Sequence, residues 1–235
     1  MTLEELRKVC KDLNLEISDH QLDQFHKMAI LLKEWNEKIN LTAITEEEEV
    51  YEKHVLDCLL PLTQETVEGT VCDVGSGGGF PGIVWAIALP NTHFTLVEPT
   101  GKKCTYLNKV KEELNLTNVE VVNARAEEFV SEKREHFDVV SARAVANLPM
   151  LSELCVPLVK VGGFFYALKG AQGLEELDAS KYALSMLGCE TPIVHECDLP
   201  NGDHRVNIRA TKIKHTDLAY PRAYARIKKK PLVGN

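Results

Sequence analysis

The sequence lacks a long hydrophobic run, paired cysteines and any spacing typical of metal ligands. Its longest apolar stretch, GIVWAIAL, is far shorter than the roughly 20 residues that a transmembrane helix needs. The N-terminus, MTLEELRKVCKDL, has mixed charge and no apolar core, unlike a secretory signal. The 7 cysteines form no CxxC pair, and without a signal they are expected to be reduced thiols. We therefore expect a monomeric cytoplasmic protein without a metal site or a membrane partner.

Positive charge is scarce outside the C-terminus. Residues 205–235 contain nine Lys or Arg and one acidic residue, whereas the rest of the chain contains 18 basic and 34 acidic residues. The acidic majority argues weakly against binding of a polyanion, and the basic segment YPRAYARIKKKPL argues for it. The alternative interpretation is that a basic terminus only improves solubility.

Residues 1–65 have the pattern of helices. The segment ISDHQLDQFHKMAILLKEWNEKI places apolar side chains on one helix face, and Ser18 with Gln21 forms a capping box at its start. That face carries Leu22, Phe25, Ala29, Leu32 and Trp35. A second helix is predicted to begin near Thr45, with the acidic run EEEE in its first turn and Val55, Leu59 and Leu62 on its apolar face.

After residue 65 short apolar strands alternate with helices, which indicates an α/β fold with a mostly parallel sheet. Five strands are followed by two more that the turn NGD joins, so the sheet is predicted to have seven strands and to end in an antiparallel hairpin. We expect three parts: an N-terminal helical extension that packs as a lid (1–65), the catalytic domain (66–215) and a basic tail (216–235).

The segment DVGSGGGFPG, residues 73–82, follows the first strand and opens a helix. Glycine inside an element costs roughly 0.5–1 kcal/mol relative to alanine, so five glycines indicate a sharp turn or a close approach to a ligand. Two patterns overlap in it. Gly77, Gly79 and Gly82 match the dinucleotide fingerprint GxGxxG, which alone is weak. Asp73, Gly75, Gly77 and Gly79 match D-x-G-x-G-x-G, the pattern of class I methyltransferases that bind S-adenosylmethionine.

Acidic residues after the strands favour the second pattern. Asp73 suits the ammonium and sulfonium cations of S-adenosylmethionine, and Glu98 ends the second strand, where a carboxylate accepts ribose hydroxyls. Ala126 and Glu127 follow the third strand, where an adenine edge would lie. A nicotinamide-dependent oxidoreductase would also use Glu98, but the helical extension is small for a substrate domain.

Several segments together resemble one family, the ribosomal RNA small subunit methyltransferase G or glucose-inhibited division protein B family. They are NLTAI, HVLDCL, DVGSGGGFPG, EPTGKK, NARAEEF, SARAVANL and FYALKG, and the resemblance runs from about Trp35 through the basic tail. It implies a Rossmann-like methyltransferase fold with S-adenosylmethionine as the cofactor. It further implies methylation of guanine N7 in the loop near position 527 of bacterial 16S ribosomal RNA, as naked RNA or in a ribonucleoprotein particle.

The resemblance also implies roles for individual residues. It assigns Gly75, Phe80, Ala126, Glu127 and Arg143 to cofactor binding and Lys103 and Lys169 to basic positions around the pocket. The chain departs from the family at Glu98, where many relatives have Asp, and in the tail, which lacks the usual Gly-Thr-Pro. The residues expected to bind RNA are Lys103, Arg222, Arg226, Lys228, Lys229 and Lys230, and we expect loss of the tail to leave cofactor affinity nearly unchanged.

The sequence also limits which atom of the RNA could accept the methyl group. It contains no Pro-Cys dipeptide for attack on cytosine C5, and Asn147 in NLPM is better explained as a helix cap than as an amine-methylation motif. Guanine N7 carries a free lone pair, so no general base is needed. Arg143 and Lys169 are expected to position the substrate electrostatically, although Arg143 could instead pair with Glu127 or Asp73.

Other roles stay open. His54 and Asp57 lie one helical turn apart, where they could meet each other or the cofactor, and Asn40 could cap or position the same segment. A non-catalytic RNA-binding or ribosome-assembly factor with a vestigial pocket is the alternative function.

Overall fold

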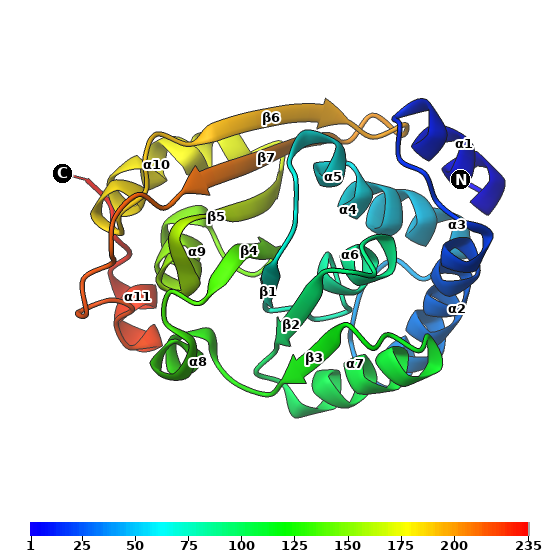
Figure 1. The fold of residues 1–235 in the computed structure, drawn as a ribbon, viewed down its shortest axis with the longest axis horizontal. Helices are drawn as coiled ribbons and strands as arrows, with labels where there is room; N and C mark the ends of the chain where they lie inside the picture. Colours follow the sequence, from blue (N-terminus) through cyan, green and yellow to red (C-terminus); the bar gives the residue numbers. More distant parts are fainter. Residues whose placement is uncertain (235) are drawn as a thin grey trace.

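The computed structural model describes residues 1–234, so the last residue of the expected tail, Asn235, lies outside the described residues. In that part of the chain, no helix is both long and apolar enough to span a membrane. One seven-stranded sheet forms the centre, with helices on both faces (Figure 1). The strands are β1 (Thr70–Val74), β2 (His93–Val97), β3 (Val119–Val122), β4 (Phe137–Arg143), β5 (Val159–Gly170), β6 (Ile193–Asp198) and β7 (His204–Thr211).

The strand order is β3-β2-β1-β4-β5-β7-β6. Strands β1 to β5 are parallel, and β7 runs antiparallel to both β5 and β6. This arrangement confirms the predicted Rossmann-like sheet with its antiparallel hairpin. The order reverses between β1 and β4, and ligands of open α/β sheets bind where the order reverses, beyond the carboxyl ends of the strands. The glycine loop follows β1 and Arg143 ends β4, so both lie at this point.

Two hydrophobic clusters cover the two faces of the sheet. The helices of the first cluster precede the sheet or connect β1 to β3: α1 (Leu3–Asp12), α2 (Asp19–Asn36), α3 (Glu47–Val50), η1 (Tyr51–Leu56), α4 (Asp57–Leu59), α5 (Pro61–Gln64), α6 (Gly82–Ala88) and α7 (Gly101–Glu113). The helices of the second cluster come later in the chain: α8 (Ala126–Lys133), α9 (Leu148–Cys155), η2 (Val156–Leu158), α10 (Gly173–Met186) and α11 (Tyr224–Lys229).

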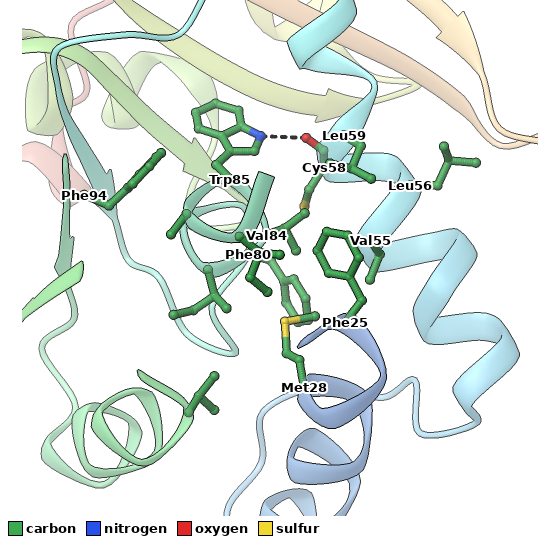
Figure 2. Packing of buried hydrophobic residues seen from close by; sticks show 14 of the residues in the cluster. Phe25, Met28, Val55, Leu56, Cys58, Leu59, Phe80, Val84, Trp85 and Phe94 are labelled. Atoms are coloured by element: carbon green, nitrogen blue, oxygen red, sulfur yellow. Dashed lines mark hydrogen bonds between the residues drawn. The ribbon is translucent and has the colours of Figure 1, made fainter. Parts of the chain in front are cut away.

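The N-terminal helices and the sheet share one core. Phe25 and Met28 of α2 lie among Val55 and Val84, and the Trp85 indole Nε1 donates to the Cys58 carbonyl at 2.6 Å (Figure 2). Fully burying one such large side chain contributes roughly 1.5–3 kcal/mol. The helices of residues 1–65 therefore pack on the sheet domain as part of its hydrophobic core.

The second N-terminal helical segment differs from a regular helix. It begins at Glu47, close to the predicted Thr45, but residues Tyr51–Leu56 form a π-helix. Short π-helical stretches often occur at functional sites. This one contains His54 and is followed directly by Asp57, the two side chains that contact Arg143.

Candidate active site

The carboxylate of Asp73 organises the glycine loop from inside. It is fully buried, and its oxygens accept hydrogen bonds from the Gly82 backbone N–H at 3.1 Å and from the Ser141 hydroxyl at 3.1 Å. Burial raises the pKa of Asp73 to about 6, although these hydrogen bonds act in the opposite direction. The Asp73 carboxylate points into the protein and lines neither of the two cavities described below.

Two of the loop glycines sit where a side chain would collide. A Cβ atom on Gly82 would lie 2.7 Å from the Asp73 carboxylate oxygen and 2.3 Å from Leu96 Cδ2. Gly75 has φ +71°, and a Cβ there would lie 2.6 Å from Val145 Cγ2. The glycines thus allow the loop to fold tightly over Asp73 and to approach the segment that follows β4.

The Glu98 side chain connects the loop to a cavity. Its carboxylate accepts from the Gly77 N–H at 3.0 Å and from the Thr100 N–H at 2.9 Å, one bond to each oxygen. An ionised carboxylate has about four acceptor positions, so each oxygen retains one for a further donor. Glu98 is only 4% exposed, and the exposed part lines a cavity.

This cavity, here named the Glu98 cavity, has a volume of about 460 Å³ and lies over the carboxyl ends of β1 and β2. Four predicted cofactor residues line it: Gly75, Glu98, Ala126 and Glu127. Apolar walls and a carboxylate with two unused acceptor positions fit an adenosine, whose ribose offers two hydroxyl donors. Gly77, Gly79 and Phe80 do not line it, and they form the loop behind it. Lys103, predicted to be a basic residue at the pocket and to bind RNA, also lines this cavity.

A second cavity, here named the Arg143 cavity, adjoins the first and has a volume of about 630 Å³. The two cavities share Ala144 and Val145, the residues that follow β4. The charged residues that line the Arg143 cavity are Lys53, Asp57, Arg143, Lys169, Glu176, Asp203 and Arg205. Both predicted catalytic residues, Arg143 and Lys169, are among them.

The Arg143 guanidinium is held on the π-helical segment. Its Nη1 lies 2.9 Å from Asp57 Oδ2, and its Nη2 donates to His54 Nδ1 at 2.8 Å. Its guanidinium also lies 5.0 Å from the centre of the Phe80 ring, which stacks on His54. The pairing with Glu127 or Asp73 that the sequence left open does not occur. Phe80 therefore supports Arg143 and His54 and lines neither cavity.

His54 is neutral at physiological pH. Burial, followed by the positive charge of Arg143, lowers the pKa of His54 to about 3. Because Arg143 always donates, Nδ1 of His54 is the acceptor, and Nε2 then donates to the Thr42 hydroxyl at 2.8 Å. Both ring nitrogens are engaged, so His54 has no free position for taking a proton. The Asn36 side chain, not the predicted Asn40, organises this segment by accepting from the N–H groups of Leu41 and Thr42.

The remaining charges of the Arg143 cavity are also paired. Asp57 Oδ1 accepts from Arg205 Nε at 2.8 Å, so one carboxylate holds arginines from β4 and β7. Lys169 Nζ lies 2.8 Å from Glu176 and donates to the Ala146 carbonyl at 2.7 Å. Lys169 thereby fixes the segment that follows β4, next to the two residues that the cavities share.

The C-terminal segment packs on the protein through Arg222 and Ile227. Arg222 forms a bidentate ion pair with the fully buried Glu153, with Nη2 at 2.6 Å from Oε2, so its guanidinium is already paired inside the protein. Ile227 is fully buried in the second cluster. Arg226, Lys228, Lys229 and Lys230 are exposed and remain candidates for RNA contacts.

Several residues at the two cavities were not predicted: Lys53, Arg125, Glu176, Asp203, Arg205 and Tyr224. Arg205 faces Gly170 in the β5–β7 pairing, directly beside Lys169. The NGD turn predicts that Arg205 lies on the last strand. Its place beside Lys169 follows only from the register of that strand against β5. Among residues 1–234, no cluster of His, Cys, Asp and Glu could hold a metal ion.

Comparison with known proteins identifies relatives of this chain. The family model described as rRNA small subunit methyltransferase G matches residues 21–206. Relatives named ribosomal RNA small subunit methyltransferase G include one from Bacillus subtilis, 43% identical over 100% of both chains. Another, from Lysinibacillus sphaericus, is 46% identical and covers 94% of this chain and 95% of its own.

Solved structures share the fold at low identity. A predicted O-methyltransferase from Agrobacterium tumefaciens has a TM-score of 0.54 at 17% identity and covers 70% of this chain and 84% of its own. A mutant 16S rRNA (adenine(1408)-N(1))-methyltransferase with cosubstrate SAM, from Catenulisporales acidiphilia, has a TM-score of 0.51 at 16% identity, covering 63% and 86%. The cofactor of this chain is S-adenosylmethionine, and the chain belongs to the rRNA small subunit methyltransferase G family.

Proposed function

We propose that this chain methylates N7 of one guanine in small-subunit ribosomal RNA, in the loop near position 527 that the family resemblance implies. The observation that carries the proposal is the absence of a free base in the described residues of the Arg143 cavity. Asp57, Glu176 and Asp203 all pair with cations, and His54 is neutral with both nitrogens engaged. Guanine N7 needs no deprotonation before it is methylated.

In this proposal the Glu98 cavity binds the cofactor and the Arg143 cavity binds the guanine. S-adenosylmethionine, when bound, supplies a methyl group on a positively charged sulfur. Glu98 holds the ribose hydroxyls in the first cavity, and the backbone of Gly75 approaches the ligand from the glycine loop. Arg143, fixed by Asp57 and His54, positions the guanine in the second cavity, next to the shared residues Ala144 and Val145. Rate enhancement then comes from alignment and electrostatics, not from proton transfer.

Other acceptor atoms are less compatible with these side chains. Methylation of cytosine C5 needs a cysteine thiolate, but six of the seven cysteines are buried, and burial raises the pKa of Cys58 to about 12. Methylation of an exocyclic amine by an NLPM motif needs a free Asn147 side chain. Asn147 Oδ1 accepts from the Met150 N–H at 3.2 Å and caps α9, as predicted.

Single-turnover methyl transfer to small-subunit rRNA tests the proposal. We expect His54→Ala to stay within about tenfold of the wild-type rate at saturating substrate, and Arg143→Ala to lose more than about 100-fold. The wild-type rate should be nearly flat from about pH 6.5 to 8.5, because no general base titrates there. A rate that follows the titration of a single group would contradict the proposal. No transfer at all by wild-type protein would favour the non-catalytic RNA-binding factor.

A further inference from the structure

The C-terminal segment reaches the Glu98 cavity. Tyr224, the first residue of α11, lines this cavity together with Ala126 and Glu127 at the start of α8. In Figure 1, α11 lies beside α8 and α9 although more than 60 residues separate it from them in sequence. The C-terminal segment, which was predicted to bind RNA and not the cofactor, therefore forms part of the wall of the Glu98 cavity.

Three contacts hold Tyr224 in this position. The Arg222 side chain binds Glu153 through two nitrogens, and the Arg222 backbone N–H donates to the same carboxylate at 2.8 Å. Ile227, one turn after Tyr224, is fully buried against α9. Because Glu153 is fully buried, loss of its arginine partner would leave an unpaired charge, which is strongly unfavourable. The contacts of Arg222 and Ile227 thus fix the position of α11 against α9.

The Tyr224 ring is available to a ligand. It is 36% exposed, and the guanidinium of Arg125, which also lines the cavity, lies 5.6 Å from its centre. Aromatic rings and planar guanidinium groups are the surfaces on which nucleobases stack in proteins. The tyrosine and the arginine therefore both contribute to the cavity wall next to Ala126 and Glu127, where the adenine edge is expected.

We propose that Tyr224 is a cofactor-binding residue, and that the C-terminal segment closes the adenosine end of the Glu98 cavity by packing the tyrosine ring against the adenine. The inference rests on the placement of S-adenosylmethionine in that cavity. It gives α11 two faces with separate tasks. Tyr224 and Ile227 face the cofactor cavity and the core, and Arg226, Lys228 and Lys229 remain exposed for phosphate contacts.

This arrangement couples the two ligands. A cofactor that packs on Tyr224 stabilises the docked α11, and docking of α11 also sets where its exposed cations lie. By thermodynamic reciprocity, RNA that binds those cations in the docked arrangement strengthens cofactor binding by the same factor. Removal of residues 222–235 is therefore expected to weaken cofactor binding, in contrast to the expectation from the sequence.

Calorimetric titration of S-adenosylhomocysteine into the full chain tests the proposal without methyl transfer. Tyr224→Ala should weaken binding on the order of tenfold through loss of the stacked ring, and Tyr224→Phe should stay within about twofold. Tyr182→Ala is the matched control, because Tyr182 is an exposed tyrosine on α10 outside the cavity. Wild-type affinity in Tyr224→Ala would overturn the proposal.

Two further measurements complete the test. Glu98→Ala should weaken binding in the same titration. If this variant binds S-adenosylhomocysteine as tightly as wild type, the cofactor does not lie in the Glu98 cavity, and the proposal for Tyr224 is contradicted as well. Amide hydrogen exchange of residues 223–230 in the wild-type protein should slow when S-adenosylhomocysteine is added. This readout does not depend on the folding of any variant, and unchanged exchange there would also overturn the proposal.

Discussion

At the scale of single residues, the Glu98 carboxylate serves two purposes. It receives the N–H groups of Gly77 and Thr100, which fixes the glycine loop against the start of α7, and it keeps an acceptor position on each oxygen for the ribose. The glutamate side chain is long enough to bring the carboxylate to the cavity wall. The side chain that we propose binds the ribose thus also shapes the glycine loop beside the cavity.

Substitution of Glu98 should therefore weaken cofactor binding and also loosen the glycine loop. We expect Glu98→Ala to weaken S-adenosylmethionine binding by about 1–3 kcal/mol, since two hydrogen bonds to a charged acceptor are removed. Calorimetry measures the change. Glu128→Ala, which removes an exposed carboxylate from neighbouring α8, should leave the affinity unchanged. Equal reductions of affinity in the two variants would show that only the net charge matters.

The buried neutral His54 predicts a pH dependence of stability. Its pKa is lowered to about 3 in the folded protein, below the roughly 6.5 of an unfolded histidine. Between these values the unfolded state binds more protons, so the contribution of His54 to stability is full above about pH 6.5 and decreases by up to about 1.4 kcal/mol per unit as the pH falls.

A comparison of variants isolates this contribution. Denaturant unfolding of His54→Gln between about pH 4 and 7 should show a shallower loss of stability than wild type, because glutamine does not titrate. The stability of wild type must be compared with that of the variant, because the contribution of Asp73 to stability changes with pH in the opposite direction to that of His54. The raised pKa of Asp73 adds stability as the pH falls. Parallel curves for the two proteins would contradict the assignment of a neutral, buried His54.

At the scale of elements, the glycine loop depends on the contact of Gly82 with Asp73. Gly82→Ala should destabilise the protein by about 1–3 kcal/mol, because the added Cβ meets Leu96 and the Asp73 carboxylate. Gly101→Ala is the matched control at the start of α7, where the nearest atom is 3.7 Å away and alanine is tolerated. Thermal unfolding measures both variants. Similar melting temperatures would contradict the proposed tight packing of the loop.

The sequence predicted most elements of the sheet domain because its strands are short, apolar and separated by clear turns. It did not predict that residues Tyr51–Leu56 form a π-helix, since side-chain periodicity over six residues does not separate π from α. The six-residue helix α11 was also missed. Its formation depends on Ile227 and Arg222 docking on α9, a tertiary effect without a local signal.

The same limit applies to the site. The sequence could place Gly75, Glu98, Ala126 and Glu127 near one another because each follows a strand in a parallel sheet, and all four line one cavity. The partners of Arg143 were not found. Asp57 precedes it by 86 residues, and their contact depends on how the N-terminal helices pack against β4. Spacing along the chain carries no information about that packing.

At the scale of the whole molecule, negative charge predominates and positive charge is concentrated near the C-terminus. The exposed cations of α11 and its end, Arg226, Lys228, Lys229 and Lys230, lie on the same short segment as Tyr224. The segment that is expected to bind phosphates is thus adjacent to the cofactor cavity.

Replacing these four cations by alanine should weaken RNA binding and reduce the slope of log affinity against log salt by roughly 0.7–0.9 for each phosphate that is no longer neutralised. Fluorescence anisotropy over a salt series measures the slope. Because Arg222 and Ile227 remain, the helix stays docked and affinity for S-adenosylhomocysteine should be unchanged. An unaltered salt slope would show that the basic segment serves solubility only.

The chemistry of the product tests the central claim most directly. N7-methylation gives guanine a fixed positive charge, and borohydride reduction then makes its glycosidic bond labile, so aniline cleaves the RNA at that nucleotide. Small-subunit rRNA incubated with the wild-type protein and S-adenosylmethionine should be cleaved at one guanine, in the loop near position 527, and Arg143→Ala should leave that site almost uncut. Methyl label that enters the RNA without reductive cleavage at a guanine would contradict the assignment of N7.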